Sequence, residues 1–280
     1  MGRIYLSVTS TFIGRFCNTR YSNHGITIVE DKIYVLVHQP KRIKVYENQI
    51  GFRFIRDIEL NGTNWPNDII YSNKSRNVYI SDYEKSCIWV MTTTTGEHRL
   101  TKWLDNVTEP NTLSLTREGH LLILRQGDLV NHLETYTLNA TLIRRLQLSE
   151  KIRDPRHVVQ TSNGNFIISH KLNSLSPLSW VISQLTNDAR IIKSVIPRNE
   201  SERLSYPGHL TLDTDSDRLF VADYYNYRVI MFDSTDLSWR QVVVSKEKNG
   251  IEFPHRLVYD ASKRHLFVAQ HANVSVYEIN

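Results

Sequence analysis

The chain has little cysteine and no long apolar run. Only Cys17 and Cys87 occur among its 280 residues, so a disulfide framework and a zinc site built from cysteines are both excluded. It also lacks the run of about eighteen apolar residues that a membrane-spanning helix needs, and we expect no membrane partner. The first nine residues are too polar for the hydrophobic core of a signal peptide.

What is present indicates a folded, globular protein. Hydrophobic residues make up 40% of the chain, charged residues 22% and aromatic residues 10%, which is enough apolar surface to form a core. The net charge of +5 permits an anionic partner without requiring one. The chain has no Gly-x-Ser-x-Gly or His-Glu-x-x-His motif and no phosphate-binding glycine loop, so the enzyme classes that depend on them are excluded.

One short pattern returns along the chain: a proline, two polar or small residues, and then an alternating apolar run. The prolines are Pro66, Pro110, Pro155, Pro207 and Pro254, and a first copy without proline begins at Asn23. Successive copies are 43, 44, 45, 52 and 47 residues apart, so six units account for nearly the whole chain. A period of about 40 to 50 residues with four strands per unit is typical of a β-propeller.

The runs within each unit favour strands over helices. The second run of each unit is strongly β-prone; these runs are residues 32–37, 77–81, 120–124, 165–169, 218–222 and 265–269. The last unit ends after three strands, whereas an extra strand, residues 3–8, precedes the first unit. We therefore predict an all-β, six-bladed propeller whose ring is closed when this N-terminal strand joins the last blade. The prediction is one domain, residues 1–280, with blades at 23–62, 63–106, 107–150, 151–203, 204–249, and 250–280 together with 1–10.

The fifth unit resembles an NHL repeat. It reads YPGHLTLD at 206–213, DRLFVAD at 217–223 and NYRVIMF at 226–232. The second unit is a fair match and keeps the family aspartate as Asp82, but the sixth has Gln270 there. The chain is thus similar to the propeller at the carboxyl end of tripartite-motif NHL proteins. That resemblance implies a non-enzymatic platform for a protein or for single-stranded or structured RNA.

A propeller places the start of each innermost strand and the end of each second strand on one face, here called the mouth. Seven of the eleven histidines are expected there, namely His24, His38, His157, His170, His209, His255 and His271. One interpretation is that this polar ring only satisfies backbone groups at the strand ends.

A second interpretation is a binding surface for a protein or RNA. Basic side chains would meet phosphates and exposed rings would stack on bases. The candidate partner-binding residues are Arg125, Arg156, Arg256, Lys151, Arg153, Trp65, Tyr83, Tyr224, Tyr225, Asn67, Asp68 and Asn111. We predict a non-enzymatic module of this kind, without a cofactor, as a monomeric domain that stands alone or belongs to a larger protein.

The alternative is a metal-dependent hydrolase or lyase. Neutral imidazoles are common ligands of divalent metals, and several are expected to converge on this channel. The candidate ligands are His24, His157, His209 and His255. The amidating lyase and the gluconolactonases are six-bladed propellers that place metals in this region. The carboxylate expected from the first blade has no match near His24.

Asparagine sequons leave the compartment open. Six are present, at Asn61, Asn73, Asn106, Asn139, Asn199 and Asn273, about twice the number that chance gives. Because the chain has no disulfide pattern, we predict a cytoplasmic protein, and secretion stays the alternative.

Overall fold

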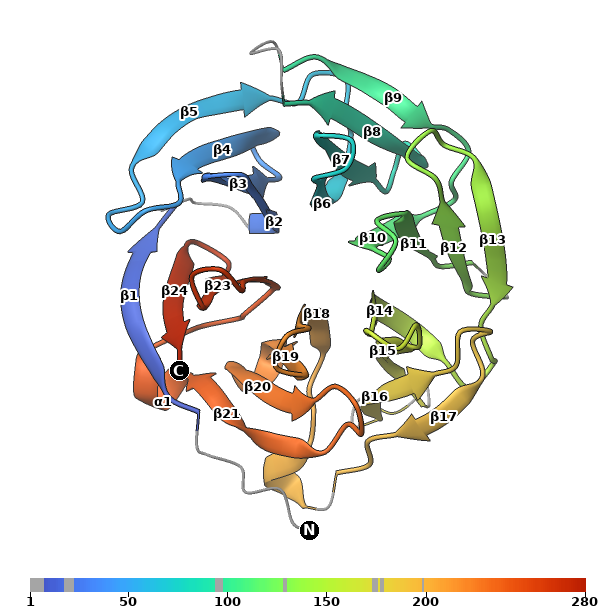
Figure 1. Ribbon diagram of the computed structural model, residues 1–280, viewed down its shortest axis with the longest axis vertical. Helices are drawn as coiled ribbons and strands as arrows, with labels where there is room; N and C mark the ends of the chain where they lie inside the picture. Colours follow the sequence, from blue (N-terminus) through green and yellow to red (C-terminus); the bar gives the residue numbers. More distant parts are fainter. Residues whose placement is uncertain are drawn as a thin grey trace.

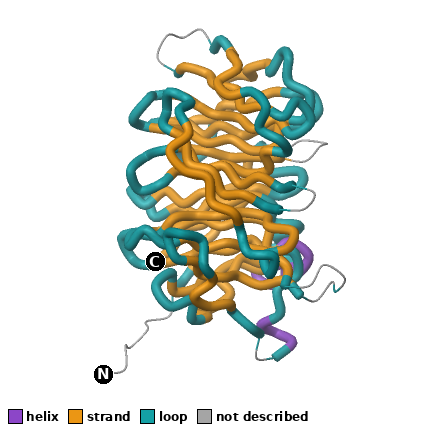
Figure 2. The backbone as a smooth tube through the Cα atoms, turned by 90° about the vertical axis from the view of Figure 1, so that its right-hand side faces the viewer, coloured by secondary structure: helices purple, strands orange, loops and turns teal. Residues whose placement is uncertain are grey.

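The computed structural model describes residues 8–17, 23–93, 98–127, 130–172, 176, 179–197 and 199–280. Within these residues, twenty-four strands form six antiparallel sheets of four strands, arranged as the blades of a ring (Figure 1). The predicted all-β, six-bladed propeller is confirmed. Seen from the side, the strands form a thick disc with loops on both faces (Figure 2). None of the helices described is long and apolar enough to cross a membrane.

The strands of each blade follow one another from the channel outwards. The first three blades are β2 Asn23–Val29, β3 Lys32–Val37, β4 Arg42–Glu47 and β5 Phe54–Glu59; β6 Pro66–Ser72, β7 Asn77–Asp82, β8 Cys87–Thr92 and β9 Leu100–Leu104; and β10 Pro110–Leu115, β11 Leu121–Arg125, β12 His132–Tyr136 and β13 Leu142–Gln147. The fourth and fifth are β14 Arg153–Gln160, β15 Phe166–Lys171, β16 Trp180–Leu185 and β17 Ile191–Ser194; and β18 Pro207–Asp213, β19 Arg218–Asp223, β20 Arg228–Asp233 and β21 Trp239–Ser245. The sixth is β22 Arg256–Asp260, β23 His265–Ala269, β24 Val274–Ile279 and then β1 Ser10–Phe16. In the connections that the structure describes there are three short helical turns: η1 Glu200–Glu202, η2 Tyr224–Asn226 and α1 Lys246–Asn249.

The ring is closed by the N-terminal part of the chain, as expected, but not by the strand that the sequence suggested. The predicted strand 3–8 lies outside the described residues except for Val8. The fourth strand of the last blade is β1, which pairs antiparallel with β24. Phe16 at its end is buried against Tyr46 and Phe52 of the first blade, with ring centroids 4.7 and 4.9 Å apart. This aromatic contact seals the junction between the last blade and the first.

The core lies between neighbouring blades. One apolar cluster joins the first and second blades and another joins the fifth and sixth. The second strand of every blade is packed on both faces, so β3, β7 and β19 are buried along almost their whole length. This explains why these strands have nearly continuous apolar sequences instead of an alternating pattern.

A buried aspartate fixes the loop that leads to the mouth in the second blade. The Asp82 carboxylate accepts hydrogen bonds from the backbone N–H groups of Asn64 and Trp65, each at 2.8 Å, and from the Trp89 indole at 3.1 Å. Asp82 is fully buried. It therefore holds the segment just before β6 in place and is not available to a ligand.

The fifth and sixth blades use the same position in the same way. The Asp223 carboxylate accepts a hydrogen bond from the Ser205 N–H at 2.7 Å, and the Gln270 side-chain oxygen accepts one from the Glu252 N–H at 2.7 Å. Glutamine can thus replace the aspartate because only an acceptor aimed at that N–H is needed.

Candidate functional site

A β-bulge at the start of the innermost strands separates two layers of side chains. The strand register shifts between Pro66 and Asp68 and again between Pro207 and His209, so one extra residue follows each proline. The residues one position past the proline are partly exposed at the mouth in most blades; this mouth layer is His24, Asn67, Asn111, Arg156 and His255. The residues two positions past are buried; this inner ring is Asp68, Thr112, His157, His209 and Arg256.

The first blade contributes only Gly25 to the inner ring. A Cβ atom at Gly25 would lie 2.6 Å from the Ile69 Cγ2 atom and 3.1 Å from the Ile69 nitrogen, so only glycine lets the first and second blades approach this closely. Arg256 of the sixth blade extends past this position. Its Nη2 donates to the Asn67 carbonyl at 3.2 Å, and its Nε lies 3.5 Å from Asp68 Oδ1.

Asp68 is fully enclosed at the channel axis. Its Oδ2 accepts the Leu113 N–H of the third blade at 2.9 Å, and its Oδ1 accepts the Ile69 N–H at 3.0 Å. Burial raises the pKa of this carboxyl group, and the Arg256 guanidinium opposes the rise. Asp68 therefore ties together three blades.

His157 and His209 stack beside Asp68, with ring centroids 3.8 Å apart and planes tilted by 35°. His157 Nδ1 accepts the Leu210 N–H at 3.4 Å, and His209 Nδ1 accepts the Leu257 N–H at 3.3 Å. Burial, together with the positive charge of Arg256, lowers the pKa of His157 to about 3, and burial lowers that of His209 well below its ordinary value. Both rings are therefore neutral at pH 7, and the proton of each is on Nε2, because Nδ1 is an acceptor.

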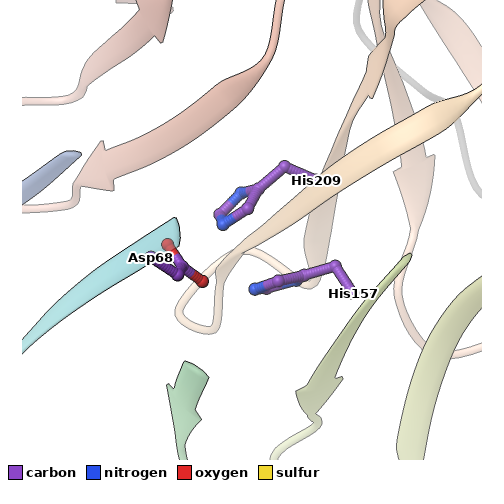
Figure 3. A group of neighbouring side chains, drawn as sticks. All are labelled: Asp68, His157 and His209. Atoms are coloured by element: carbon purple, nitrogen blue, oxygen red, sulfur yellow. The ribbon is translucent and has the colours of Figure 1, made fainter. Parts of the chain in front are cut away.

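The three side chains converge from β6, β14 and β18 (Figure 3). One carboxylate oxygen and one nitrogen of each imidazole lie within 4.8 Å of one another. A carboxylate and two neutral imidazoles form a donor set that divalent transition metals accept.

The hydrogen bonds around the cluster oppose a metal. A histidine that binds metal through Nε2 donates a hydrogen bond from Nδ1, whereas Nδ1 of both His157 and His209 accepts one from the backbone. The guanidinium of Arg256 beside Asp68 adds a competing cation. The residues as arranged do not fit a metal ion.

The four histidines predicted as metal ligands lie at two depths. His24 and His255 belong to the mouth layer, with ring centroids 5.8 Å apart, whereas His157 and His209 are in the inner ring. Asp68, which the sequence placed among the partner-binding residues, is the group that joins His157 and His209. Its position two residues after a proline, like theirs, is the signal that could have revealed this.

Aromatic rings form a continuous series of contacts along the mouth. This aromatic arc runs from the fourth blade through the fifth, sixth and first to the second, and consists of Trp180, Tyr206, Tyr224, His255, His24, His38 and Trp65. Successive ring centroids are 4.1 to 5.8 Å apart. Tyr225, 55% exposed, packs on Tyr206 and Tyr224, and Trp65 is 39% exposed. The sequence indicated Trp65, Tyr224 and Tyr225 but missed Tyr206, which links them to the fourth blade.

Predicted partner-binding residues also line a hollow at the mouth. Trp65, Asn67, Tyr83, Asn111 and Arg156 surround a cavity of about 370 Å³. The Asn67 amide donates to Asn111 Oδ1 at 2.9 Å. These five residues, separated by up to 91 positions in sequence, are brought together by the ring.

The predicted cations have nearby carboxylates. Arg125 pairs with the buried Glu134 at 2.6 Å, and Arg156 pairs with Asp154 at 2.5 Å. Arg156 also lies over the Tyr206 ring, 4.6 Å from its centroid.

The two remaining basic candidates lie away from the mouth cavity. Arg153 lines a second hollow together with Glu150 and Asp154. Lys151 lines a third hollow together with Asp188. The structure therefore does not gather the five cations into one patch.

A larger cavity, of about 470 Å³, follows the channel beyond the inner ring. His157 and His209 line one end of it. Exposed residues Arg117, Ser162 and Thr214 line the other end, in the turns after the innermost strands. The cavity therefore opens on the face opposite the mouth, a feature that no repeat pattern reveals.

Comparisons with known proteins show the fold alone. No family model matches this chain, and no similar sequence is found among curated proteins. A gluconolactonase from Xanthomonas campestris superposes with a TM-score of 0.71 at 11% identity, covering 97% of this chain and 89% of that one. Virginiamycin B lyase from Staphylococcus aureus, in a catalytically inactive form with quinupristin, gives 0.66 at 10% identity, covering 97% and 99%. A chain of a nidogen/laminin complex gives 0.65 at 14% identity, covering 82% of each.

Proposed function

We propose that this chain is a non-enzymatic interaction module of the NHL type, similar to the propeller of tripartite-motif NHL proteins, and that its mouth binds a partner protein. The observation that carries the proposal is the aromatic arc, which connects five of the six blades at one face. Large aromatic side chains contribute much of the binding energy at protein interfaces.

The arc is held in place before any partner arrives. Asp82 fixes the backbone at Trp65, and Asp223 fixes the segment just before Tyr206. Because these loops are already ordered, little conformational entropy would be lost on binding. Trp65 and Tyr225 expose the apolar area that a partner would cover.

A protein partner is favoured over RNA by the state of the cations. Arg125, Arg156 and Arg256 each have a carboxylate within 3.5 Å. Phosphate binding would require these pairs to be broken or shared, which reduces the gain from counterion release.

The test is quantitative affinity purification with three forms of the chain. The double variant Trp65→Ala, Tyr225→Ala should lose the partners that the wild type retains. Phe54→Ala, which truncates an aromatic residue of 48% exposure on the outer strand β5, is the matched control and should retain them. Equal recovery by wild type and double variant would overturn the proposal, and tight, steeply salt-dependent binding to an RNA pool would replace protein by RNA as the partner.

The second candidate is a metal-dependent hydrolase or lyase, and the proximity of Asp68 to His157 and His209 is the observation in its favour. The backbone hydrogen bonds to both Nδ1 atoms stand against it. Elemental analysis of protein purified without chelators decides the matter: stoichiometric zinc or manganese that is lost in Asp68→Asn would support the enzyme, and metal-free protein would eliminate it.

We also propose the cytoplasm as the compartment. Five of the six sequon asparagines, Asn61, Asn73, Asn106, Asn139 and Asn199, are exposed, so a secreted chain would be accessible to glycans at these positions. A loss of mass after treatment of the natural protein with a glycan-removing amidase would contradict the cytoplasmic assignment.

A further inference from the structure

One end of the channel cavity contains a buried donor, His157 Nε2, that makes no hydrogen bond of ordinary length, although the Leu113 backbone is near enough to interact with the ring. His157 is only 2% exposed, it lines the cavity, and its Nε2 has no hydrogen-bond partner among the described residues. Leaving a buried polar group without a partner is unfavourable, because the group has lost its hydrogen bonds to water. Such a group at the end of a cavity indicates that something with a complementary atom occupies the space.

The chemistry of that atom follows from the three groups around it. His157 and His209 present Nε2–H donors, because their Nδ1 atoms accept backbone hydrogen bonds. Asp68 is not among the residues that line the cavity, but one of its carboxylate oxygens lies within 4.8 Å of a nitrogen of each imidazole and presents an acceptor. A group that fits must accept from the two imidazoles and donate to the carboxylate, and a hydroxyl group does both.

The spacing also fits an oxygen atom. When three atoms lie within 4.8 Å of one another, some point lies within 4.8/√3, or about 2.8 Å, of all three. About 2.8 Å is the usual length of a hydrogen bond to oxygen, so one oxygen atom can reach all three groups.

The cavity walls define the rest of the ligand. Ile69, Leu113, Val159, Leu210 and Leu257 supply aliphatic surface. Two wall hydroxyls are already engaged: Thr27 accepts the Tyr71 N–H at 3.1 Å, and Ser114 donates to the Val158 carbonyl at 2.8 Å. An apolar body therefore suits the walls better than a polar one.

We propose that the channel binds a small hydroxyl compound with an apolar body, which enters from the face opposite the mouth. Its hydroxyl oxygen accepts hydrogen bonds from His157 and His209 and donates one to Asp68. This site is separate from the mouth and does not depend on a partner binding there.

The test uses four compounds that share a cyclohexane ring: cyclohexanol, methoxycyclohexane, cyclohexanecarboxylate and cyclohexylamine. Imidazole nitrogen resonances of the ¹⁵N-histidine-labelled protein report both tautomer and binding. We expect His157 and His209 as neutral Nε2–H tautomers, with saturable shifts on addition of cyclohexanol and none at His132 in β12, which is the internal control. Methoxycyclohexane lacks the hydroxyl donor and should bind at least about tenfold more weakly than cyclohexanol. Cyclohexanecarboxylate should also bind more weakly, because Asp68 repels its charge. Protonated cyclohexylamine should bind more weakly because its ammonium group cannot accept hydrogen bonds from the imidazoles.

Three outcomes would overturn the proposal. The first is an Nδ1–H tautomer at either ring, or stoichiometric bound metal. The second is equal shifts with all four compounds, which would show non-selective binding. The third is no saturable shift with cyclohexanol, which would leave water as the occupant. The tautomer is measured on the unaltered protein, so this part of the test does not depend on a variant. Asp68→Asn should lower the affinity for cyclohexanol and leave the weaker affinity for methoxycyclohexane unchanged.

Discussion

Replacing Arg256 by methionine tests whether the inner ring is held by a buried ion pair. Asp68 and Arg256 side chains are only 3% and 6% exposed, so Arg256→Met leaves a buried carboxylate without its cation. Removal of one partner of a buried pair costs about 3–5 kcal/mol. Because about 1 kcal/mol lowers the melting temperature of a chain of this size by about 2–4 °C, we expect a decrease of about 10 °C at pH 7.5.

The loss should depend on pH in a defined direction. Burial already raises the pKa of Asp68 in the folded state, and removal of Arg256 raises it further. A carboxyl group whose folded pKa exceeds its unfolded value stabilises the fold at low pH and loses that contribution as the pH rises through the folded pKa. The difference between Arg256→Met and wild type should therefore be smallest near pH 4 and largest at neutral pH.

Urea unfolding at pH 4.5, 6 and 7.5 gives the measurement, within a double-mutant cycle with Asp68→Asn. The cycle is needed because Arg256 also lowers the pKa of His157. In the Asp68→Asn background, Arg256→Met should cost much less, and the part of the pH dependence due to the carboxylate should vanish. Arg42→Met is the control: it breaks a pair with Asp57 in which both side chains are nearly one-third exposed, and should cost less than about 1 kcal/mol. Equal losses in the two Asp68 backgrounds would refute the reasoning.

Three further predictions concern the groups that position the site. Asp82→Ala should lower the free energy of unfolding by about 3–4 kcal/mol in urea melts, since it removes the acceptor of several buried donors. Asp105→Ala, at an exposed carboxylate, is the control and should change the free energy of unfolding by less than about 0.5 kcal/mol. Similar values for the two variants would show that Asp82 does not hold the segment before β6 in place. Gly25→Ala should cost about 1–3 kcal/mol by thermal melting, because its methyl group would overlap Ile69, and an unchanged melting temperature would contradict that close approach. The free energy of unfolding of the wild type should decrease as the pH falls below about 6.5, because His157 is neutral in the fold and binds a proton on unfolding. Each such histidine adds up to about 1.4 kcal/mol per pH unit to the slope of the free energy against pH. His157→Phe should make this slope shallower between pH 6 and 4, and equal slopes for variant and wild type would count against a neutral buried ring.

The blade architecture was predictable because its signals are local. The run at 32–37 coincides with β3, and that at 265–269 coincides with β23. Both are second strands, buried on two faces, so their composition alone marks them. The closing strand was misplaced for the opposite reason: β1 is an outer strand in which every residue except Phe16 is exposed or half-buried. Its position depends on the contact of Phe16 with Tyr46, which no local pattern encodes.

The sequence indicated which residues belong to the candidate site, but not how deep in the channel each of them lies. The repeat correctly indicated that His24, His157, His209 and His255 come from the starts of innermost strands. It did not indicate that a one-residue difference in position within the bulge separates a mouth residue from an inner-ring residue. The tautomers were also beyond the sequence, since they depend on backbone N–H groups of the next blade, such as that of Leu210.

The bulge has a consequence for how the two proposed sites relate. In most blades a residue of the mouth layer directly precedes the residue at the inner-ring position, so Asn67 precedes Asp68 and His255 precedes Arg256. Since these neighbours face different spaces, a change at the mouth need not alter the inner ring, and the channel can bind a small molecule while the mouth binds a protein. The direct contact between the sites is made by Arg256, whose guanidinium donates to the Asn67 carbonyl at 3.2 Å and lies beside Asp68. An effect of cyclohexanol on partner affinity that disappears in Arg256→Lys would identify that contact as the connection, whereas an effect that survives would place the coupling elsewhere.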